Sequence, residues 1–186
     1  MRHNLTPENF MSNLHPDLAR IMITVEEIQE RVGELADQIS EDYSGVERIY
    51  IIGVLKGAFI FLADLTRQLR VPHVVDFMAL SSYGRTTVSG AVRIVMDLRE
   101  PIEGQHVLIV EDIVDSGQTL SYLHNILRGR SPASLKTCAL LQKERNKSDV
   151  PIDYLGFRSP DVWVVGYGLD FADKHRTLPY IAEMKK

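Results

Sequence analysis

The sequence predicts an α/β protein with a central, mostly parallel sheet flanked by helices. Three observations predict this fold class. Apolar, β-branched runs alternate with segments whose apolar residues recur at helical spacing. Some of these runs, such as Ile49 to Leu55, are apolar throughout, as expected for strands that are buried on both faces. Polar residues follow directly after the strands, at the edge where open α/β sheets bind ligands.

Three helices and seven strands account for the alternation. Thr24 and Glu27 form a capping box ahead of apolar residues at helical spacing, which predicts a helix over about 25–41. Further helices are expected over about 58–70 and 117–128. Strands are expected at 49–55, 74–81, 92–97, 107–110, 135–141, 154–157 and 162–165.

The length and composition indicate one globular domain. At about 150 residues per domain, 186 residues predict a single domain. The formal net charge of −4 argues against a general nucleic-acid binder and against attachment to anionic lipid. Cys138 is the only cysteine, so no intramolecular disulfide is possible. Because the sequence has neither a signal peptide nor an apolar run that could span a bilayer, we expect a cytoplasmic protein without a membrane partner.

The stretch VLIVEDIVDSGQTL, residues 107–120, points to a binding site. A buried strand is followed by Glu111 and Asp112, then by Asp115, and then by small and hydroxyl residues at the start of a helix. The free amides of a helix N-terminus suit a phosphate group. Two adjacent carboxylates suit a ligand that also carries vicinal hydroxyls or a metal ion.

A simpler interpretation of this stretch is a helix cap and a solvated loop. Asp115, which precedes Ser116-Gly117, could be only a helix-capping residue. However, the three acids Glu111, Asp112 and Asp115 within five residues favour a functional site. Neither a G-x-x-x-x-G-K-[ST] nor a G-x-G-x-x-G motif occurs, which argues against a P-loop NTPase and a dinucleotide-binding protein. The six histidines show no paired spacing typical of metal ligands and are assigned no role.

The 107–120 stretch resembles the phosphoribosyl pyrophosphate (PRPP) signature of the type I phosphoribosyltransferases. Other segments narrow the resemblance to the hypoxanthine-guanine branch of that family. The matching segments are the pyrophosphate loop Leu55-Lys56-Gly57-Ala58, the mobile catalytic loop Ser82-Tyr83-Gly84, the purine-reading Lys143, and the base-binding segment Trp163 to Asp170 with Arg176 beyond it.

The resemblance implies transfer of the 5-phosphoribosyl group of PRPP to N9 of hypoxanthine, and of guanine, giving IMP or GMP and pyrophosphate in purine salvage. One alternative is a xanthine-preferring or broader 6-oxopurine enzyme. Another is a PRPP-sensing regulator that binds RNA or DNA, which the negative charge and the room for only one domain disfavour. We therefore expect PRPP and a 6-oxopurine as partners, and no nucleic acid.

The resemblance also implies which residues bind PRPP and a Mg²⁺ cofactor. The implied groups are Ser116, Gly117, Gln118 and Thr119 for the 5′-phosphate; Glu111 and Asp112 for the ribose hydroxyls; Lys56, Gly57 and Arg176 for pyrophosphate; and Glu111, Asp112 and Asp170 for Mg²⁺. In this family the peptide bond before the loop lysine can be cis.

On the purine side, the resemblance makes Asp115 the general base that takes the N7 proton, with a pKa that we expect its neighbours and closure around the ligand to raise. Lys143 would donate to the 6-oxo group, and Trp163 would stack on the base. Val164 and Asp170 would contact the base edge through their backbone. Without the resemblance, Lys143 could be a solvated lysine and Trp163 a core aromatic.

Ser82 and Tyr83 begin a stretch rich in serine, threonine and glycine between two predicted strands. It could be only a hairpin tip, but a lid that closes over PRPP and excludes water is the functional interpretation.

The resemblance implies one domain over 1–186, with a core at about 45–150 and a small hood formed by about 1–24 and 151–186. It also implies a homodimer or a homotetramer.

Overall fold

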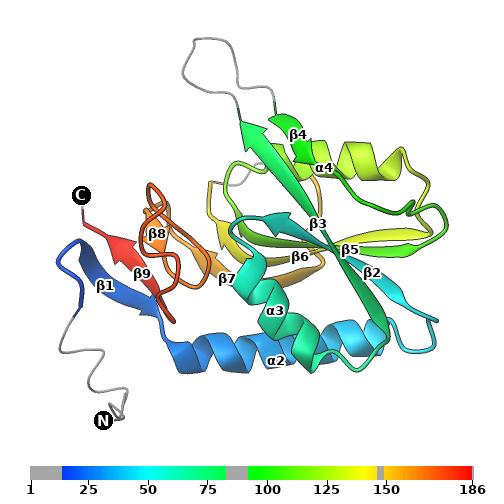
Figure 1. Ribbon diagram of the computed structural model, residues 1–186. Helices are drawn as coiled ribbons and strands as arrows, with labels where there is room; N and C mark the ends of the chain where they lie inside the picture. The colour runs from blue at the N-terminus through cyan, green and yellow to red at the C-terminus, as the bar shows by residue number, and fades with distance from the viewer. Residues whose placement is uncertain (1–13, 83–91, 146–148, 186) are drawn as a thin grey trace.

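The computed structural model describes residues 14–82, 92–145 and 149–185 (Figure 1). Its helices are α2 (Val25–Asp42), α3 (Phe59–Gln68) and α4 (Gln118–Arg128). A large sheet contains β2 (Ile49–Leu55), β3 (His73–Ser82), β4 (Val92–Met96), β5 (His106–Val114), β6 (Ser134–Lys143) and β7 (Tyr154–Ser159). A small sheet contains β1 (Leu18–Ile23), β8 (Val164–Val165) and β9 (Ile181–Met184).

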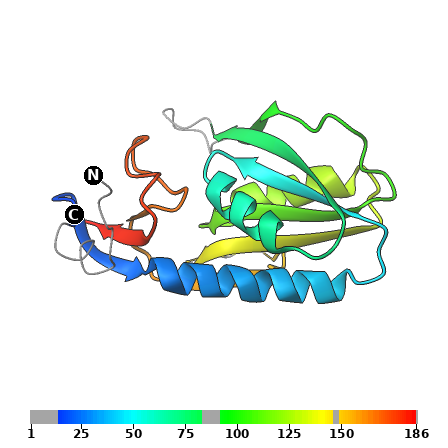
Figure 2. The ribbon, with the colours of Figure 1, turned by 60° about the horizontal axis from the view of Figure 1, so that its bottom comes forward.

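The large sheet has the strand order β4-β3-β2-β5-β6-β7, and only β3 and β4 pair antiparallel. Successive residues of β2 face opposite sides of this sheet. Ile51 packs in a core with α2 and α3, whereas Ile52 packs in a second core with α4. Figure 2 shows the helices lying on the two faces of the sheet. The predicted fold class, a mostly parallel sheet flanked by helices, is therefore confirmed.

The end of β5 has a neighbouring strand on one side only. β2 pairs with β5 as far as Gly53 opposite Val110, and the chain then leaves β2 for α3. β6 continues to pair with β5 as far as Val114 opposite Gln142. The strand predicted to end at residue 110 therefore runs four residues further, because β6 still provides backbone hydrogen-bond partners. This extension carries Glu111 and Asp112 along an open edge.

The small sheet joins the two ends of the described chain, since β1 pairs antiparallel with β9 and β9 with β8. β1 and β9 were not predicted. Each is short and carries a charged residue, and Arg20 Nε of β1 lies 2.9 Å from Glu183 Oε2 of β9. The range 151–186 given to the hood needs a correction, because β7 falls within it but pairs with β6 in the large sheet. The hood strands are β1, β8 and β9.

Other boundaries differ slightly from prediction. α3 ends at Gln68 rather than at residue 70, because Leu69 adopts an extended backbone with φ −67° and ψ 136°. The strand predicted over 162–165 is reduced to Val164–Val165. No helix in the described part of the chain is both long and apolar enough to cross a membrane.

Candidate active site

A cavity of about 270 Å³ lies at the carboxyl ends of β2, β3 and β5. Its walls come from the turn after β2, from Leu80 near the end of β3, and from the segment that leads from β5 into α4. Of the predicted site residues, the cavity brings together Lys56, Gly57, Glu111, Asp112, Asp115, Ser116, Gly117 and Thr119, whereas Asp170 and Arg176 do not line it. Gln118 is exposed and does not line this cavity.

The start of α4 is suited to bind an anion. Gly117 has a left-handed backbone with φ 80°, which glycine adopts without steric cost, and it turns the chain from β5 into the helix. No side chain caps the helix, and its first turn has no acidic residue. The first backbone N–H groups of α4 therefore lie beside the cavity without a capping partner, at the positive end of the helix dipole.

Gly57 is in close contact with the segments on both sides of it. A Cβ atom on Gly57 would lie 1.5 Å from Asp112 Oδ2, so only glycine fits between the turn and β5. The loop between β8 and β9, residues 166–180, is called the hood loop. Its Gly168 has φ 106°, and a Cβ atom there would lie 2.0 Å from the Gly57 carbonyl oxygen. The Leu55-Lys56 peptide bond is cis. The turn after β2 is thus packed between the acids of β5 and the hood.

Glu111 and Asp112 are acids in a poorly solvated position. Burial, assisted by the charge of Asp112, holds the pKa of Glu111 well above its ordinary value. Burial also raises the pKa of Asp112 to about 6, although hydrogen bonds from backbone N–H groups and the charge of Arg176 oppose the shift. A bound cation would favour the ionised form of both acids, and their oxygen atoms are ligands that Mg²⁺ prefers.

Asp115 is engaged by Arg145, which contacts both of its carboxylate oxygens. Lys143 Nζ lies 4.0 Å from Asp115 Oδ2. The hydrogen bonds from Arg145 hold the pKa of Asp115 below its ordinary value, and the charge of Lys143 acts in the same direction. The part of the expectation that assigns a raised pKa to the neighbouring groups is therefore wrong, since the nearest neighbours are cations; the effect of closure around a ligand stays a prediction. Asp161 completes the cluster, 3.6 Å from Lys143 Nζ and 3.3 Å from Arg145 Nη1.

Lys143 is buried although lysines are usually exposed, and Trp163 is exposed although tryptophans are usually buried. The Lys143 side chain is only 6% exposed, whereas Trp163 is 65% exposed. Lys143 Nζ lies 5.5 Å from the centre of the indole ring, and Phe171 packs edge-to-face against the same ring. Lys143 is thus no solvated lysine, and Trp163 is no core aromatic. Val164, the next residue, is buried in β8.

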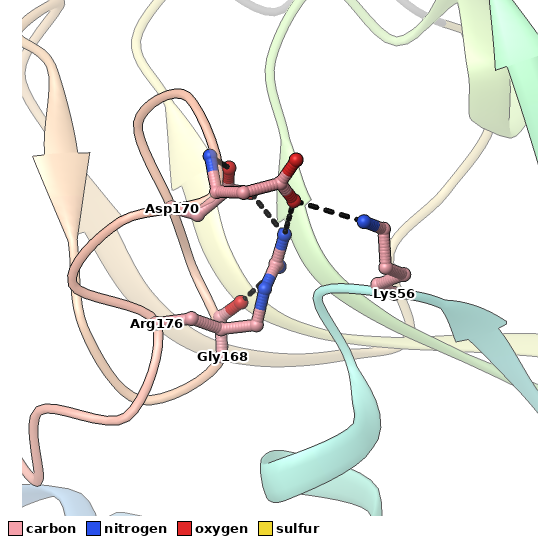
Figure 3. Close-up of polar contacts among 5 residues, drawn as sticks. Lys56, Gly168, Asp170 and Arg176 are labelled. Atoms are coloured by element: carbon pink, nitrogen blue, oxygen red, sulfur yellow. Dashed lines mark hydrogen bonds and ion pairs between the residues drawn. The ribbon is translucent and has the colours of Figure 1, made fainter.

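A further polar cluster joins the turn after β2 to the hood loop (Figure 3). Lys56 Nζ donates to Asp173 Oδ1 at 2.8 Å. Arg176 donates to Asp170 Oδ1 at 2.5 Å and to the Gly168 carbonyl at 2.6 Å. The charges of Arg176 and Asp170 act in opposite directions on the pKa of Asp112, which Arg176 lowers and Asp170 raises.

Three charged residues of these clusters were not predicted: Arg145, Asp161 and Asp173. Each follows a strand or a predicted site residue within a few positions, but nothing in the sequence says which cation meets which acid. Of the predicted lid, Ser82 is the last residue of β3, and Tyr83 lies outside the described residues.

Comparisons with known proteins agree with this architecture. A model of the phosphoribosyl transferase domain matches residues 24–172. The chain is 48% identical over 171 residues to the hypoxanthine-guanine phosphoribosyltransferase of Dictyostelium discoideum, covering 89% of this chain and 95% of that protein. It is 49% identical over 168 residues to the hypoxanthine phosphoribosyltransferase of Salmonella typhimurium, covering 88% of this chain and 94% of that protein.

The solved structures that resemble this chain include further hypoxanthine phosphoribosyltransferases. A hypoxanthine-guanine phosphoribosyltransferase from Bacillus anthracis matches with a TM-score of 0.86 and 45% identity, over 90% of this chain and 99% of that one. The hypoxanthine phosphoribosyltransferase of Trypanosoma cruzi in complex with its product IMP also has a TM-score of 0.86, with 44% identity over 92% of this chain and 97% of that one.

The fold, the PRPP-type loop between β5 and α4, and these matches define a type I phosphoribosyltransferase, and the chain belongs to that family. Within the family, it belongs to the hypoxanthine-guanine branch.

Proposed function

We propose that the protein transfers the 5-phosphoribosyl group of PRPP to N9 of hypoxanthine, and of guanine, and releases pyrophosphate. The observation that carries this proposal is the single cavity shared by the start of α4, the buried acids of β5, and Asp115. Groups suited to a phosphate and a ribose line this cavity together with Asp115, and Lys143 Nζ lies 4.0 Å from the Asp115 carboxylate. The names of the similar proteins, and the IMP complex of the Trypanosoma cruzi enzyme, support the same reaction.

PRPP would bind with its 5′-phosphate at the first turn of α4. Ser116, Gly117 and Thr119 supply backbone amides and hydroxyls beside the cavity, and the helix dipole favours the phosphate charge. Gln118 would contribute only its backbone amide, because it does not line the cavity. Glu111 and Asp112 would accept hydrogen bonds from the ribose hydroxyls.

The leaving pyrophosphate would meet Lys56, the Gly57 amide and Arg176. In the described structure, the cations of this set are held by Asp173 and Asp170. Pyrophosphate would therefore have to compete with two carboxylates for the same cations. Because negative charge accumulates on pyrophosphate as the glycosidic bond breaks, cations fixed in advance stabilise the transition state more than the ground state.

Glu111, Asp112 and Asp170 provide a carboxylate set that fits Mg²⁺. All are oxygen ligands, and a bound cation would offset the burial that raises the pKa values of Glu111 and Asp112. When bound, Mg²⁺ would neutralise charge on the pyrophosphate group.

Asp115 would accept the N7 proton as the sugar bonds to N9, and the buried Lys143 would donate to the 6-oxo group. The exposed face of Trp163 would stack on the base, with the backbone of Val164 and Asp170 at the base edge. Arg145 contacts both oxygens of the Asp115 carboxylate and would compete there with the N7 proton. Movement of Arg145 away from Asp115 would therefore make the carboxylate a stronger base. Lys143 would favour 6-oxopurines over adenine, whose 6-amino group is itself a donor.

The proposal is tested by ultraviolet-monitored turnover of hypoxanthine, guanine, xanthine and adenine, each with PRPP and Mg²⁺. We expect magnesium-dependent formation of IMP and GMP, with adenine inert; the xanthine assay decides whether the broader 6-oxopurine alternative applies. Asp115→Asn should abolish most turnover. Asp37→Asn, which removes another arginine-paired aspartate on α2, is the matched control and should be fully active.

The fluorescence of Trp163, the only tryptophan, provides an independent binding assay. IMP should quench this fluorescence in the wild type and in Asp115→Asn alike, because the substitution removes the base and leaves the stacking face. Binding of PRPP without turnover of any purine would overturn the catalytic proposal and favour the regulator.

We further propose that the enzyme acts in the cytoplasm as a homodimer or homotetramer without nucleic-acid or membrane partners, which light scattering and salt-dependent nucleic-acid binding assays would check.

A further inference from the structure

Two histidines and an aspartate meet outside the PRPP site, where the segment before β1 approaches the hood loop. His15 and Asp17 directly precede β1, and His175 lies in the loop between β8 and β9. The pairing of β1 with β9 brings these distant segments together, and Figure 2 shows both strands at one end of the molecule. Lys185 N donates to the Asp17 carbonyl at 2.8 Å, which fixes the backbone at this end of the sheet.

The spacing of the three side chains is that of metal ligands. Asp17 Oδ2 lies 3.5 Å from His15 Nδ1 and 3.3 Å from His175 Nε2. One ligand atom from each residue lies within 4.8 Å of the other two. In tetrahedral coordination at about 2.1 Å, neighbouring ligand atoms are about 3.4 Å apart, so both measured distances fit one shared ion.

One of the two ring nitrogens, His175 Nε2, has no hydrogen-bond partner. The His175 side chain is only 9% exposed, and its Nε2 is buried without a hydrogen bond, even though Asp17 lies near it. His15 Nδ1 accepts a long hydrogen bond from the backbone N–H of Asp17 at 3.3 Å, which a metal ion at this nitrogen would replace. His124 Nδ1 is also buried without a hydrogen bond, but among the described residues only His175 Nε2 combines this with two other potential metal ligands within 4.8 Å.

We propose that His15, Asp17 and His175 bind a divalent transition-metal ion of the zinc class, with a solvent molecule as the fourth ligand. Two imidazoles and one carboxylate suit Zn²⁺, Co²⁺ or Ni²⁺, whereas Mg²⁺ prefers the all-oxygen set of Glu111 and Asp112. The site is therefore chemically distinct from the PRPP site.

This ion would act as a clamp on the hood. His175 is followed by Arg176, which holds Asp170 and the Gly168 carbonyl. Through His175, the ion would tie that loop to the segment before β1. Metal binding would thus restrict the loop that carries Arg176 and stabilise the folded chain, because the unfolded chain does not hold the three ligands together.

The test uses the full-length, untagged chain, freed of metal and then titrated with Co²⁺ in excess Mg²⁺, which fills the oxygen-ligand site. We expect one equivalent of Co²⁺ to give the visible absorption of a four-coordinate ion with nitrogen ligands, and Zn²⁺ to displace it. Calorimetry should give the same stoichiometry, and the melting temperature should rise with Zn²⁺ concentration. None of these measurements depends on turnover.

Three variants locate the ion. His175→Gln and Asp17→Asn should each lose the cobalt absorption and the zinc-dependent stabilisation, whereas His73→Gln, on β3, should keep both. Asp17 is half exposed, so Asp17→Asn should fold even if His175→Gln does not. Absence of one-to-one binding in the wild type, or equal binding by all variants, would refute the site and leave the cluster as an ion pair between Asp17 and protonated histidines.

Discussion

Replacing Asp112 with asparagine should stabilise the ligand-free protein while weakening its binding of PRPP. Asp112 lies under Gly57 in a position where burial raises its pKa from 3.8 to about 6. A carboxyl group whose pKa is higher in the folded than in the unfolded state opposes folding whenever it is ionised. The opposition is fully present above the folded pKa and disappears as the pH falls toward the unfolded value.

The size of the effect follows from the shift. A change of about two pKa units corresponds to about 3 kcal/mol at pH 7.5, falling to roughly half of that at pH 5. Asparagine keeps the shape of the side chain and cannot ionise, so its variant should gain up to that amount. In a chain of this size, the gain corresponds to a rise of roughly 6 to 12 °C in melting temperature.

Urea unfolding of wild type and Asp112→Asn at pH 7.5 and pH 5 measures the difference directly. Glu103→Gln, which neutralises an exposed acid on a turn, is the control and should change the free energy of unfolding little at either pH. The affinity for PRPP, followed by calorimetry with Mg²⁺, should fall in Asp112→Asn. A variant no more stable than the wild type at pH 7.5, or a gain that does not shrink at pH 5, would refute the reasoning.

Three further predictions concern Arg145, Gly57 and Cys138. Arg145→Ala removes the cation that lowers the pKa of Asp115, so the acidic limb of the pH profile of kcat/KM should move to higher pH; an unmoved limb would contradict the role of Asp115 as base. Gly57→Ala should raise KM for PRPP at least about tenfold, since its Cβ has no space, whereas Gly33→Ala in α2 should leave KM unchanged. Cys138 is fully buried and its pKa is raised, so thiol reagents should modify it only after unfolding; rapid labelling of the native protein would be inconsistent with this burial.

Local signals were sufficient for much of the fold. The capping box before α2 forms both of its hydrogen bonds, from Glu27 N to Thr24 Oγ1 at 3.2 Å and from Thr24 N to Glu27 Oε2 at 2.7 Å. These signals act over three or four residues, so the sequence displays them directly. The turn at Gly117, where we propose that the 5′-phosphate binds, is equally local. The hood strands were missed because pairing across the whole chain, rather than their own composition, creates β1 and β9.

The electrostatics of the site could not be predicted in the same way. A carboxylate has its pKa lowered beside a cation and raised by burial, and only the folded chain decides which applies. Asp115 is thirty residues from Arg145 in the sequence, and the pair forms because β6 returns the chain to the end of β5. The cluster of His15, Asp17 and His175 likewise combines the two ends of the chain, so no spacing rule could find it.

The parallel ladder between β5 and β6 sets more than the position of the buried acids. Val114, the last residue of β5, lies opposite Gln142, and this last pair is followed directly by Asp115 on one chain segment and by Lys143 on the other. Under the proposed roles, one meets N7 of the purine and the other meets the 6-oxo group, and these two atoms are neighbours on the same edge of the base. The pairing of β5 with β6 thus sets the distance between the two side chains that would contact N7 and the 6-oxo group. A slip of one residue would turn Lys143 to the other face of the sheet, so base recognition is as firmly fixed as the strand pairing itself.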